Sequence, residues 1–266
     1  MLKLATWNIN SVRLRAGLVA RFLKEAGADI LCLQEIKCEE GLFPRKVFVE
    51  LGYPHIAITG QRGYHGVATV SKFPLEPLPR ESFCGTEEAR HLGCAVKLPG
   101  GKTLALHNIY VPAGGDIPDP ETNPKFKQKL AFLDSLASWR AFKKGELAIL
   151  LGDFNVAPLE SDVWSHKQLL NVVSHTPIEV EALTKVQRAG GWHDLLRRFI
   201  PPDQKLYTWW SYRAHDWETS NRGRRLDHIW ASESAAARAS GAEVFKQSRG
   251  WERPSDHVPA IVQLEL

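Results

Sequence analysis

The amino-acid sequence predicts an α/β fold, a four-layer sandwich in which two mixed β-sheets pack face to face and helices cover their outer faces. Two observations lead to this prediction. Strand-like segments outnumber helical ones, and neighbours joined as in hairpins are mixed with neighbours joined by crossovers. The 266 residues contain no Pro/Gly/Ser-rich linker, low-complexity tract or clear internal repeat, so we expect one domain over residues 1–266.

Apolar periodicity assigns the first helix to residues 15–27. Leu14, Leu18 and Phe22 recur every four positions, and Gly27 ends the pattern. Short apolar runs bounded by turn residues are assigned as strands. Strands are expected at residues 2–7, 29–34, 55–59, 66–71, 92–98, 103–111, 146–152, 226–231 and 259–264.

The clearest helix start in the second half of the chain is Thr176. This capping threonine is followed by Pro177 and, three residues after the cap, by Glu179. Residues 156–175 have no clear periodicity and are expected to be loop and irregular helix. Further helices are expected at residues 44–52, 126–144 and 192–200.

The composition is that of an ordinary globular domain, with 44% hydrophobic and 24% charged residues and a net charge of +4. Basic residues are grouped along the chain, either as solvated faces or as a footprint for a polyanion. The groups are Arg13/Arg15/Arg21, Lys125/Lys127/Lys129, Arg197/Arg198 and Arg222/Arg224/Arg225.

The cysteines show neither CxxC nor zinc-type spacing, and Cys32 lies in an apolar run, so we predict that it is a small core residue. The first residues have neither a basic nor a long apolar segment, so we expect no signal peptide, and no apolar run is long enough to span a bilayer. We therefore expect a reducing, cytoplasmic location without membrane association. The four cysteines are Cys32, Cys38, Cys84 and Cys94.

Residues 146–155 form the most informative segment, an apolar run that stops at Gly152 and continues as Asp153-Phe154-Asn155. Such a run is typical of a strand buried on both faces. Because side chains alternate along a strand, Asp153 and Asn155 point to the same side. We predict that they form one wall of a metal or phosphate site.

Three further segments repeat this design, in which apolar strand residues are followed by polar groups at the carboxyl end. They carry Asn8, Glu35 and Asp227, and Asp256-His257 precedes the last strand. Since sites gather at the carboxyl edge of parallel strands, we expect these ends to converge. Oxygen ligands without thiolates favour magnesium or manganese over zinc.

Each residue also has a simpler interpretation. Asn8 alone could be a turn or capping residue, Glu35 a surface acid at a strand end, and Tyr110 a core aromatic. His55 and His107 are expected to be structural. These separate interpretations do not explain why all the groups occur together in this order.

The joint pattern extends over nine segments: 6–13 (TWNINSVR), 33–37 (LQEIK), 63–68 (GYHGVA), 108–112 (NIYVP), 151–155 (LGDFN), 192–194 (WHD), 207–213 (YTWWSYR), 225–229 (RLDHI) and 255–257 (SDH). With these motifs the chain resembles the exonuclease III family of abasic-site endonucleases, within the endonuclease/exonuclease/phosphatase superfamily. The resemblance implies a DNase I-like fold.

The resemblance also implies catalytic roles. Asp153 would orient and deprotonate the attacking water, Asn155 would hydrogen-bond the phosphate, and Tyr110 would contact the phosphate or the leaving oxygen. Asp227 would orient His257, whose charged form would brace a phosphoryl oxygen. The implied cofactor is Mg²⁺, with Mn²⁺ as a substitute. Its implied site consists of Asn8, Glu35, Asp153, Asn155, Asp256 and His257.

The implied substrate is double-stranded DNA with an abasic site or a 3′ end. Trp209 and Leu226 would line a small apolar pocket for a base-free sugar flipped from the helix. Arg224 stands at a pocket-lining position where relatives often carry an apolar residue. The implied substrate-binding residues are Arg13, Lys37, Arg90, Trp209, Arg224 and Leu226.

The expected function is therefore a magnesium-dependent DNA-repair nuclease that cleaves 5′ of abasic sites, with 3′→5′ exonuclease and 3′-phosphodiesterase activity. Two alternatives use the same fold: a non-catalytic nucleic-acid-binding regulator, and a phosphatase of the superfamily acting on lipid or inositol phosphates. We expect a monomer and, in a bacterium, association with the nucleoid.

Overall fold

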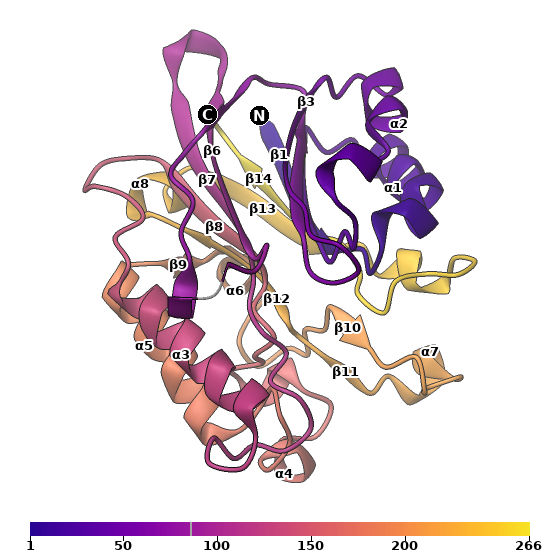
Figure 1. Ribbon diagram of the computed structural model, residues 1–266, viewed down its shortest axis with the longest axis vertical. Coiled ribbons are helices and arrows are strands. Elements are labelled where there is room, and N and C mark those ends of the chain that lie inside the picture. Colours follow the sequence, from indigo (N-terminus) through magenta and orange to yellow (C-terminus); the bar gives the residue numbers. More distant parts are fainter. Residues whose placement is uncertain (86) are drawn as a thin grey trace.

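Two six-stranded sheets pack face to face in the computed structural model, which describes residues 1–85 and 87–266 (Figure 1). The first sheet has the order β13 (Ala239–Val244), β14 (Ala260–Leu264), β1 (Leu2–Asn8), β2 (Ile30–Gln34), β4 (Val67–Ser71), β3 (His55–Thr59). The second has the order β5 (Leu75–Pro77), β6 (His91–Lys97), β7 (Thr103–Tyr110), β8 (Ala148–Asp153), β12 (Asp227–Ala231), β9 (His193–Asp194).

Helices cover the outer faces of both sheets. The helices α1 (Val12–Ala26) and α2 (Arg45–Glu50) pack on the first sheet, and α3 (Pro124–Ser138) and α5 (Pro177–Gly190) pack on the second. Figure 1 shows these pairs on opposite flanks. The predicted four-layer sandwich is confirmed. The shorter elements are α4 (His166–Leu169), α6 (Leu195–Phe199), α7 (Trp217–Ser220), α8 (Glu233–Ala236) and a ribbon of β10 (Trp209–Trp210) with β11 (Gly223–Arg224).

The alternation of side chains along the strands explains both the core and the place of the polar residues. Leu2 and Leu4 of β1 point between the sheets, and this face continues to Asn8 at the strand end. In β8, Leu151 occupies the same central layer, and Asp153 follows it two residues later. The apolar layer between the sheets therefore ends in polar side chains at one end of the molecule.

A buried hydrogen-bonded pair joins the two sheets where the apolar layer ends. The Nε2 of Gln34 in β2 donates to Oδ1 of Asn108 in β7 at 2.7 Å and to Thr6 Oγ1 at 2.9 Å. The Nδ2 of Asn108 donates in turn to the carbonyls of Leu33 and Ala68. Because buried polar groups are costly without partners, this network fixes the spacing of the sheets beside the site.

The two longest predicted helices of the first half of the chain differ from the structure in their bounds. The first begins at Val12, earlier than expected, although Gly27 ends it as predicted with a left-handed φ of 64°. The prediction of one helix over residues 126–144 is wrong, because α3 ends at Ser138. The backbone is extended from Trp139, whose ring packs against His107 at 4.7 Å between centroids.

The edge strands were the hardest elements to predict. The strand β13 pairs with β14, but its sequence ASGAEV has little of the β-branched and aromatic character typical of strands. Residues 193–194, which we assigned to a helix, form β9, and Asp194 then caps α6 by accepting from the backbone of Arg197.

The predicted start of α5 is correct, since the Glu179 carboxylate accepts from the Thr176 backbone and hydroxyl.

Gly152 is required by the close approach of β8 to β7. Its φ is +139°, and a Cβ built there would lie 1.9 Å from the carbonyl oxygen of Ile109. We expect Gly152→Ala to lower the free energy of unfolding by about 3 kcal/mol, because neither the backbone angle nor the space suits a side chain.

Urea unfolding of Gly152→Ala measures this effect, and Gly17→Ala is the matched control. Gly17 lies in α1 with nothing within 4 Å of an added Cβ, so its replacement should stabilise the fold by up to about 1 kcal/mol. Equal stability of the two variants would contradict the argument.

Buried neutral histidines make the fold sensitive to acid. Burial lowers the pKa of His107 and of His228 to about 4, and burial beside His107 lowers that of His91 to about 3. His107 stacks on His91 with centroids 5.4 Å apart, which fits its expected structural role. His55 lies on the edge strand β3.

We expect stability to fall as the pH drops below 6.5, the ordinary pKa of histidine. Below this pH the histidines bind protons in the unfolded chain but stay neutral in the folded chain. Each of them therefore lowers the free energy of unfolding by about 1.4 kcal/mol per pH unit. Urea midpoints between pH 7 and 4 measure the slope. His228→Gln keeps a donor for the Val156 carbonyl. It should reduce the slope by the contribution of one histidine, and an unchanged slope would refute this account.

Candidate active site

The predicted strand ends converge at one end of the sandwich. Asn8, Tyr110 and Asp153 are the last residues of β1, β7 and β8, and Glu35 directly follows β2. One detail of the prediction is wrong. Asp227 is the first residue of β12, not a residue at its carboxyl end, because β12 runs antiparallel to β8 and places Asp227 opposite Asp153.

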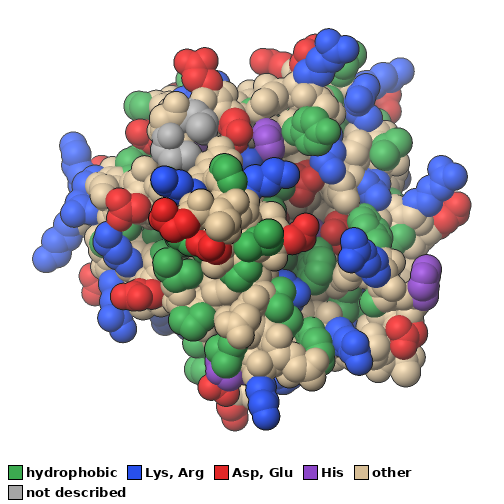
Figure 2. Space-filling model, turned by 60° about the horizontal axis from the view of Figure 1, so that its bottom comes forward, with side chains coloured by type: hydrophobic (Ala, Val, Ile, Leu, Met, Phe, Trp, Pro, Cys, Tyr) green, Lys and Arg blue, Asp and Glu red, His purple; other side chains and the backbone are tan. Residues whose placement is uncertain are grey.

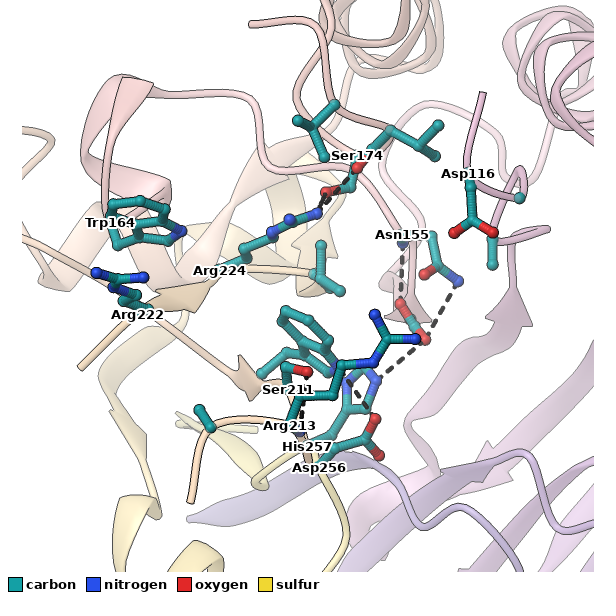
Figure 3. Close-up of a pocket in the computed structure, with 18 of the residues that line it drawn as sticks. Asp116, Asn155, Trp164, Ser174, Ser211, Arg213, Arg222, Arg224, Asp256 and His257 are labelled. Carbon is teal, nitrogen blue, oxygen red and sulfur yellow. Dashed lines mark hydrogen bonds and ion pairs between the residues drawn. The ribbon is translucent and has the colours of Figure 1, made fainter. Parts of the chain in front are cut away.

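A cavity of about 920 Å³ opens over these residues. Its lining includes Glu35, Asp153, Asn155, Asp256 and His257 together with an apolar wall (Figure 3). Asn8 and Asp227 are fully buried behind this lining. Figure 2 shows a hollowed face with Lys and Arg side chains spread around it, interspersed with acidic ones.

Asp153 accepts hydrogen bonds from three directions. Its Oδ2 accepts from Asn8 Nδ2 at 2.8 Å and from Asn155 Nδ2 at 3.3 Å, and its Oδ1 accepts from the Asn155 backbone at 2.9 Å. Burial raises the pKa of Asp153 to about 7, and the positive charge of His257 offsets only part of this. A carboxylate with this pKa is suited to accept a proton near neutral pH.

His257 is held by Asp227, as predicted. The His257 Nδ1 lies 2.8 Å from Asp227 Oδ2, and its Nε2 lies 3.7 Å from Asp153 Oδ2. Burial alone would lower the pKa of His257, but the two facing carboxylates outweigh it and raise the pKa to about 10. The imidazolium form can therefore donate from Nε2 into the cavity.

Glu35 and Asp153 share the carboxamide of Asn8. The Glu35 Oε1 accepts from Asn8 Nδ2 at 2.9 Å and from the Tyr110 hydroxyl at 2.9 Å, and its Oε2 lies 2.9 Å from the ammonium of Lys37. Burial tends to raise the pKa of Glu35, but Lys37 and Asn8 outweigh it and lower the pKa. Burial raises the pKa of Tyr110, so its hydroxyl remains a donor.

Asp256 joins this group through Asn10, to which sequence reasoning assigned no role. Asn10 Nδ2 donates to Asp256 Oδ1 at 3.3 Å, and Asn10 Oδ1 accepts from Lys37 Nζ at 2.5 Å. The second oxygen of Asp256 accepts from Trp209 Nε1 at 3.0 Å. Asn10, Glu35 and Lys37 all have φ near +50°, a strained conformation that tends to occur at functional sites.

The site has the donor chemistry of a divalent cation site. Asp153, Asp227 and His257 each offer an atom within 4.8 Å of the others, so this group could hold a metal ion. An imidazolium cannot coordinate a metal, however, and the Asp227 oxygen bound to it is engaged. The carboxylates of Glu35 and Asp153, bridged by Asn8, offer the oxygen donors that hard ions prefer.

The two neighbouring tryptophans have different environments. Trp209 lines the cavity with Leu226 and Arg224, whereas Trp210 is buried in a core cluster with Tyr207 and Val258. Trp209 and Leu226 pack with Trp164 in a separate apolar cluster. Trp164 has no regular pattern around it in the sequence, which explains why it was not predicted.

The other predicted substrate-binding residues lie outside the cavity lining. Arg13 is exposed on α1, Lys37 pairs with Glu35, and Arg90 packs over the Tyr110 ring at 4.9 Å. Arg90 also donates to the Tyr110 carbonyl. Arg90 therefore lies behind Tyr110 in this structure and can support its position.

Three residues of the basic groups do not belong to any exposed surface. Lys129 is fully buried and paired with Glu179. Arg225 pairs with Asp162 at 2.8 Å and with Asp194 at 2.6 Å. The third, Arg197, also pairs with Asp162, at 2.6 Å. Their charges are satisfied inside the fold, so for these three residues both interpretations, a solvated face and a polyanion footprint, are wrong.

Sequence reasoning also missed residues that position His257. The Trp7 indole donates to the His257 carbonyl at 2.9 Å, and Ser255 Oγ accepts from the His257 backbone at 3.2 Å. Thr208 Oγ1 accepts from the backbone of Asp227 at 3.1 Å. These residues belong to recognised motifs, but only the folded chain shows their partners.

The model of the Endonuclease/Exonuclease/phosphatase family matches residues 5–257. This chain belongs to that family. It is 31% identical over 278 residues to an exodeoxyribonuclease of Bacillus subtilis, with 100% of both chains covered. The predicted resemblance to the exonuclease III branch is confirmed, and the chain is a phosphodiester hydrolase of this family.

Solved structures of the family show the same fold. An AP endonuclease from Archaeoglobus fulgidus is 34% identical, with a TM-score of 0.89 and 100% of each chain covered. A 3′ phosphatase from Neisseria bound to a product DNA hairpin is 28% identical, with the same TM-score and coverage. Within residues 1–85 and 87–266, none of the helices has the length and apolar character needed to span a bilayer.

Proposed function

We propose that this protein is a magnesium-dependent DNA-repair nuclease that hydrolyses phosphodiesters 5′ of abasic sites and also acts as a 3′→5′ exonuclease and 3′-phosphodiesterase. The observation that carries the proposal is the joint presence, at one cavity, of the Glu35–Asn8–Asp153 group and the Asp227–His257 pair beside an apolar wall. Relatives named as an exodeoxyribonuclease and an AP endonuclease support it.

The proposed reaction is in-line attack of water on the phosphorus. Asp153, with its raised pKa, takes the proton of the water. Asn155 and the imidazolium of His257 donate to the phosphate oxygens on which negative charge increases in the transition state. Tyr110 donates its hydroxyl to the phosphate or to the leaving oxygen. The products are a 5′ fragment with a 3′-hydroxyl and a fragment with a 5′-phosphate.

Mg²⁺ fits the oxygen donors of the site, with Glu35 as the proposed direct ligand. The other residues proposed around the ion would contribute chiefly by hydrogen bonds to its bound waters. They are Asn8, Asp153, Asn155, Asp256 and His257. When bound, the ion would supply Lewis-acid polarisation of the phosphate. Magnesium keeps several waters, so one or two direct protein ligands suffice, and Mn²⁺ is expected to substitute.

The proposed partner is double-stranded DNA with an abasic site or a 3′ end, bound by a monomer. Exposed basic residues such as Arg13 contact the backbone phosphates, and the apolar wall of Trp209 and Leu226 takes the base-free residue. A cytoplasmic, nucleoid-associated location agrees with this substrate. A non-catalytic regulator is less favoured because every predicted acid of the site is present. A superfamily phosphatase is less favoured because a tryptophan-lined wall adjoins the site.

A cleavage assay tests the proposal. The purified protein is incubated with a duplex that carries one abasic residue, in the presence of Mg²⁺ or of EDTA. We expect one incision 5′ of the residue with Mg²⁺ and none with EDTA. Equal cleavage under both conditions, or none, would refute it. Faster turnover of inositol phosphates than of DNA would favour the phosphatase alternative.

A further inference from the structure

Arg224 places a charged side chain in the apolar wall of the cavity. It lies in β11, pairs with Trp209 of β10, and its guanidinium lies 5.3 Å from the centroid of the Trp209 ring. Leu226 follows two residues later and lines the same cavity. Figure 3 shows Arg224 extending along the cavity towards Ser174.

The orientation of Arg224 is fixed by only one of its nitrogens. Its Nη1 donates to the Val173 carbonyl at 2.9 Å and to Ser174 Oγ at 2.7 Å. Ser174 is itself held, because its backbone N–H donates to both carboxylate oxygens of Glu179, at 3.0 and 2.9 Å. Glu179 pairs with the fully buried Lys129, so this anchor is rigid.

Within residues 1–85 and 87–266, the Nη2 of Arg224 has no hydrogen-bond acceptor, whereas Nη1 has two. Its Nε is buried without a hydrogen-bond partner, and no carboxylate among residues 1–85 and 87–266 forms an ion pair with it. Burial lowers the pKa of Arg224, and only the attraction of Glu179 opposes this. A guanidinium carries five N–H donors. Because the Nε atom is enclosed by protein, the Nη2 group is the one with which a ligand oxygen in the cavity can form a hydrogen bond.

The surroundings of the guanidinium limit what that ligand can be. Trp209, Leu226 and Trp164 form an apolar cluster beside it, whereas the groups suited to a phosphate, Asn155 and His257, lie in the catalytic part of the cavity. A residue of the cleaved strand that enters here places its sugar against the apolar side chains. Deoxyribose carries its phosphates on C3′ and C5′, so its C1′ edge faces away from the catalytic groups.

We propose that Arg224 is a specificity-determining residue that donates a hydrogen bond to an oxygen on C1′ of the extrahelical sugar. The proposal rests on the nuclease function proposed above and narrows its substrate class. The preferred lesions are abasic sugars that carry an oxygen at C1′, as a hydroxyl or, after oxidation, as a carbonyl. A sugar without this oxygen leaves the Arg224 donors unpaired.

Two duplexes that differ at this one atom test the proposal. One contains a tetrahydrofuran residue, which has no oxygen on C1′, and the other a 2-deoxyribonolactone residue, which has a carbonyl there. We expect the wild-type protein with Mg²⁺ to cleave the lactone duplex with a kcat/KM about tenfold higher, the effect of one charge-assisted hydrogen bond. A natural abasic residue, with a hydroxyl on C1′, should fall between them.

Arg224→Leu should reduce the ratio of the lactone rate to the tetrahydrofuran rate to about one. Arg224→Lys keeps the charge but not the fork of donors, and should retain part of the preference. Arg222→Leu is the matched control. Arg222 lies 4.8 Å from the Trp164 ring centroid and lines the same cavity, and its loss should affect both substrates equally.

Two outcomes would overturn the proposal: a wild-type ratio near one, or a ratio that persists in Arg224→Leu. A persisting ratio with an equal loss on both substrates would indicate that Arg224 binds a backbone phosphate. These outcomes are distinct from a failure of the nuclease function itself, in which the wild-type protein would cleave neither duplex. Thermal unfolding of each variant shows whether it is folded.

Discussion

Asp153→Asn is expected to lower kcat by about 10³- to 10⁴-fold, equivalent to about 4 to 5.5 kcal/mol of transition-state free energy. The carboxamide keeps the shape of the side chain, but its single oxygen can accept from only one of the two donors, the Asn8 amide or the Asn155 backbone, which bind different oxygens of Asp153. It cannot take a proton from water at neutral pH. We therefore expect the loss in kcat, with KM nearly unchanged.

Asp134→Asn is the control for this substitution. Asp134 is an exposed residue of α3 that pairs with Lys185 at 2.6 Å, and its replacement should leave the rate unchanged. Steady-state cleavage of the abasic duplex gives kcat for both variants, and single-turnover cleavage gives the rate of the chemical step. A loss of less than about tenfold in Asp153→Asn, or about 1.4 kcal/mol, would show that another group deprotonates the water.

The strand-borne part of the site could be predicted from the sequence because two local rules suffice for it. Apolar runs mark the buried strands, and alternation along them places Asn8 and Asp153 on the inner face. Parallel pairing of β1 with β2 and of β7 with β8 then brings their carboxyl ends together. The face-to-face packing of the two sheets places Asn8 beside Asp153.

What could not be predicted depends on pairing between distant segments. The direction of β12 was uncertain because a strand and its reverse have the same alternation, so Asp227 was assigned to the wrong strand end. Charge alone does not separate exposed from buried basic residues. Lys129 and Arg225 find their carboxylates on other helices and loops, and only the folded chain brings these groups together.

The catalytic groups and the apolar wall lie on different kinds of structure. The catalytic groups lie on the regular sheets, whereas Trp164 and Trp209 lie on irregular segments and on the short β10–β11 ribbon. Loops and ribbons tolerate sequence change better than the sheets that carry them. The wall is thus the part of the site where this chain can differ from its relatives in substrate choice while keeping the chemistry.

Glu35→Gln is expected to lower kcat by about 10³-fold at a fixed, low Mg²⁺ concentration and to weaken the apparent affinity for Mg²⁺ at least about tenfold. Glutamine can still accept from Asn8 and from the Tyr110 hydroxyl. It lacks the negative charge of Glu35, whose Oε2 lies 2.9 Å from Lys37 Nζ. Raising the Mg²⁺ concentration should therefore restore part of the rate in Glu35→Gln but not in Asp153→Asn.

A measurement without substrate separates metal binding from catalysis. A cation that binds the folded chain raises its Tm, so Mg²⁺ should stabilise the wild-type protein and Asp153→Asn more than Glu35→Gln. Glu25→Gln, an exposed residue of α1 paired with Arg21, is the matched control and should respond as the wild type does. If Mg²⁺ raised the Tm of Glu35→Gln as much as that of Glu25→Gln, Glu35 would not be a metal ligand, and its carboxylate would serve only to hold Asn8, Tyr110 and Lys37 in place.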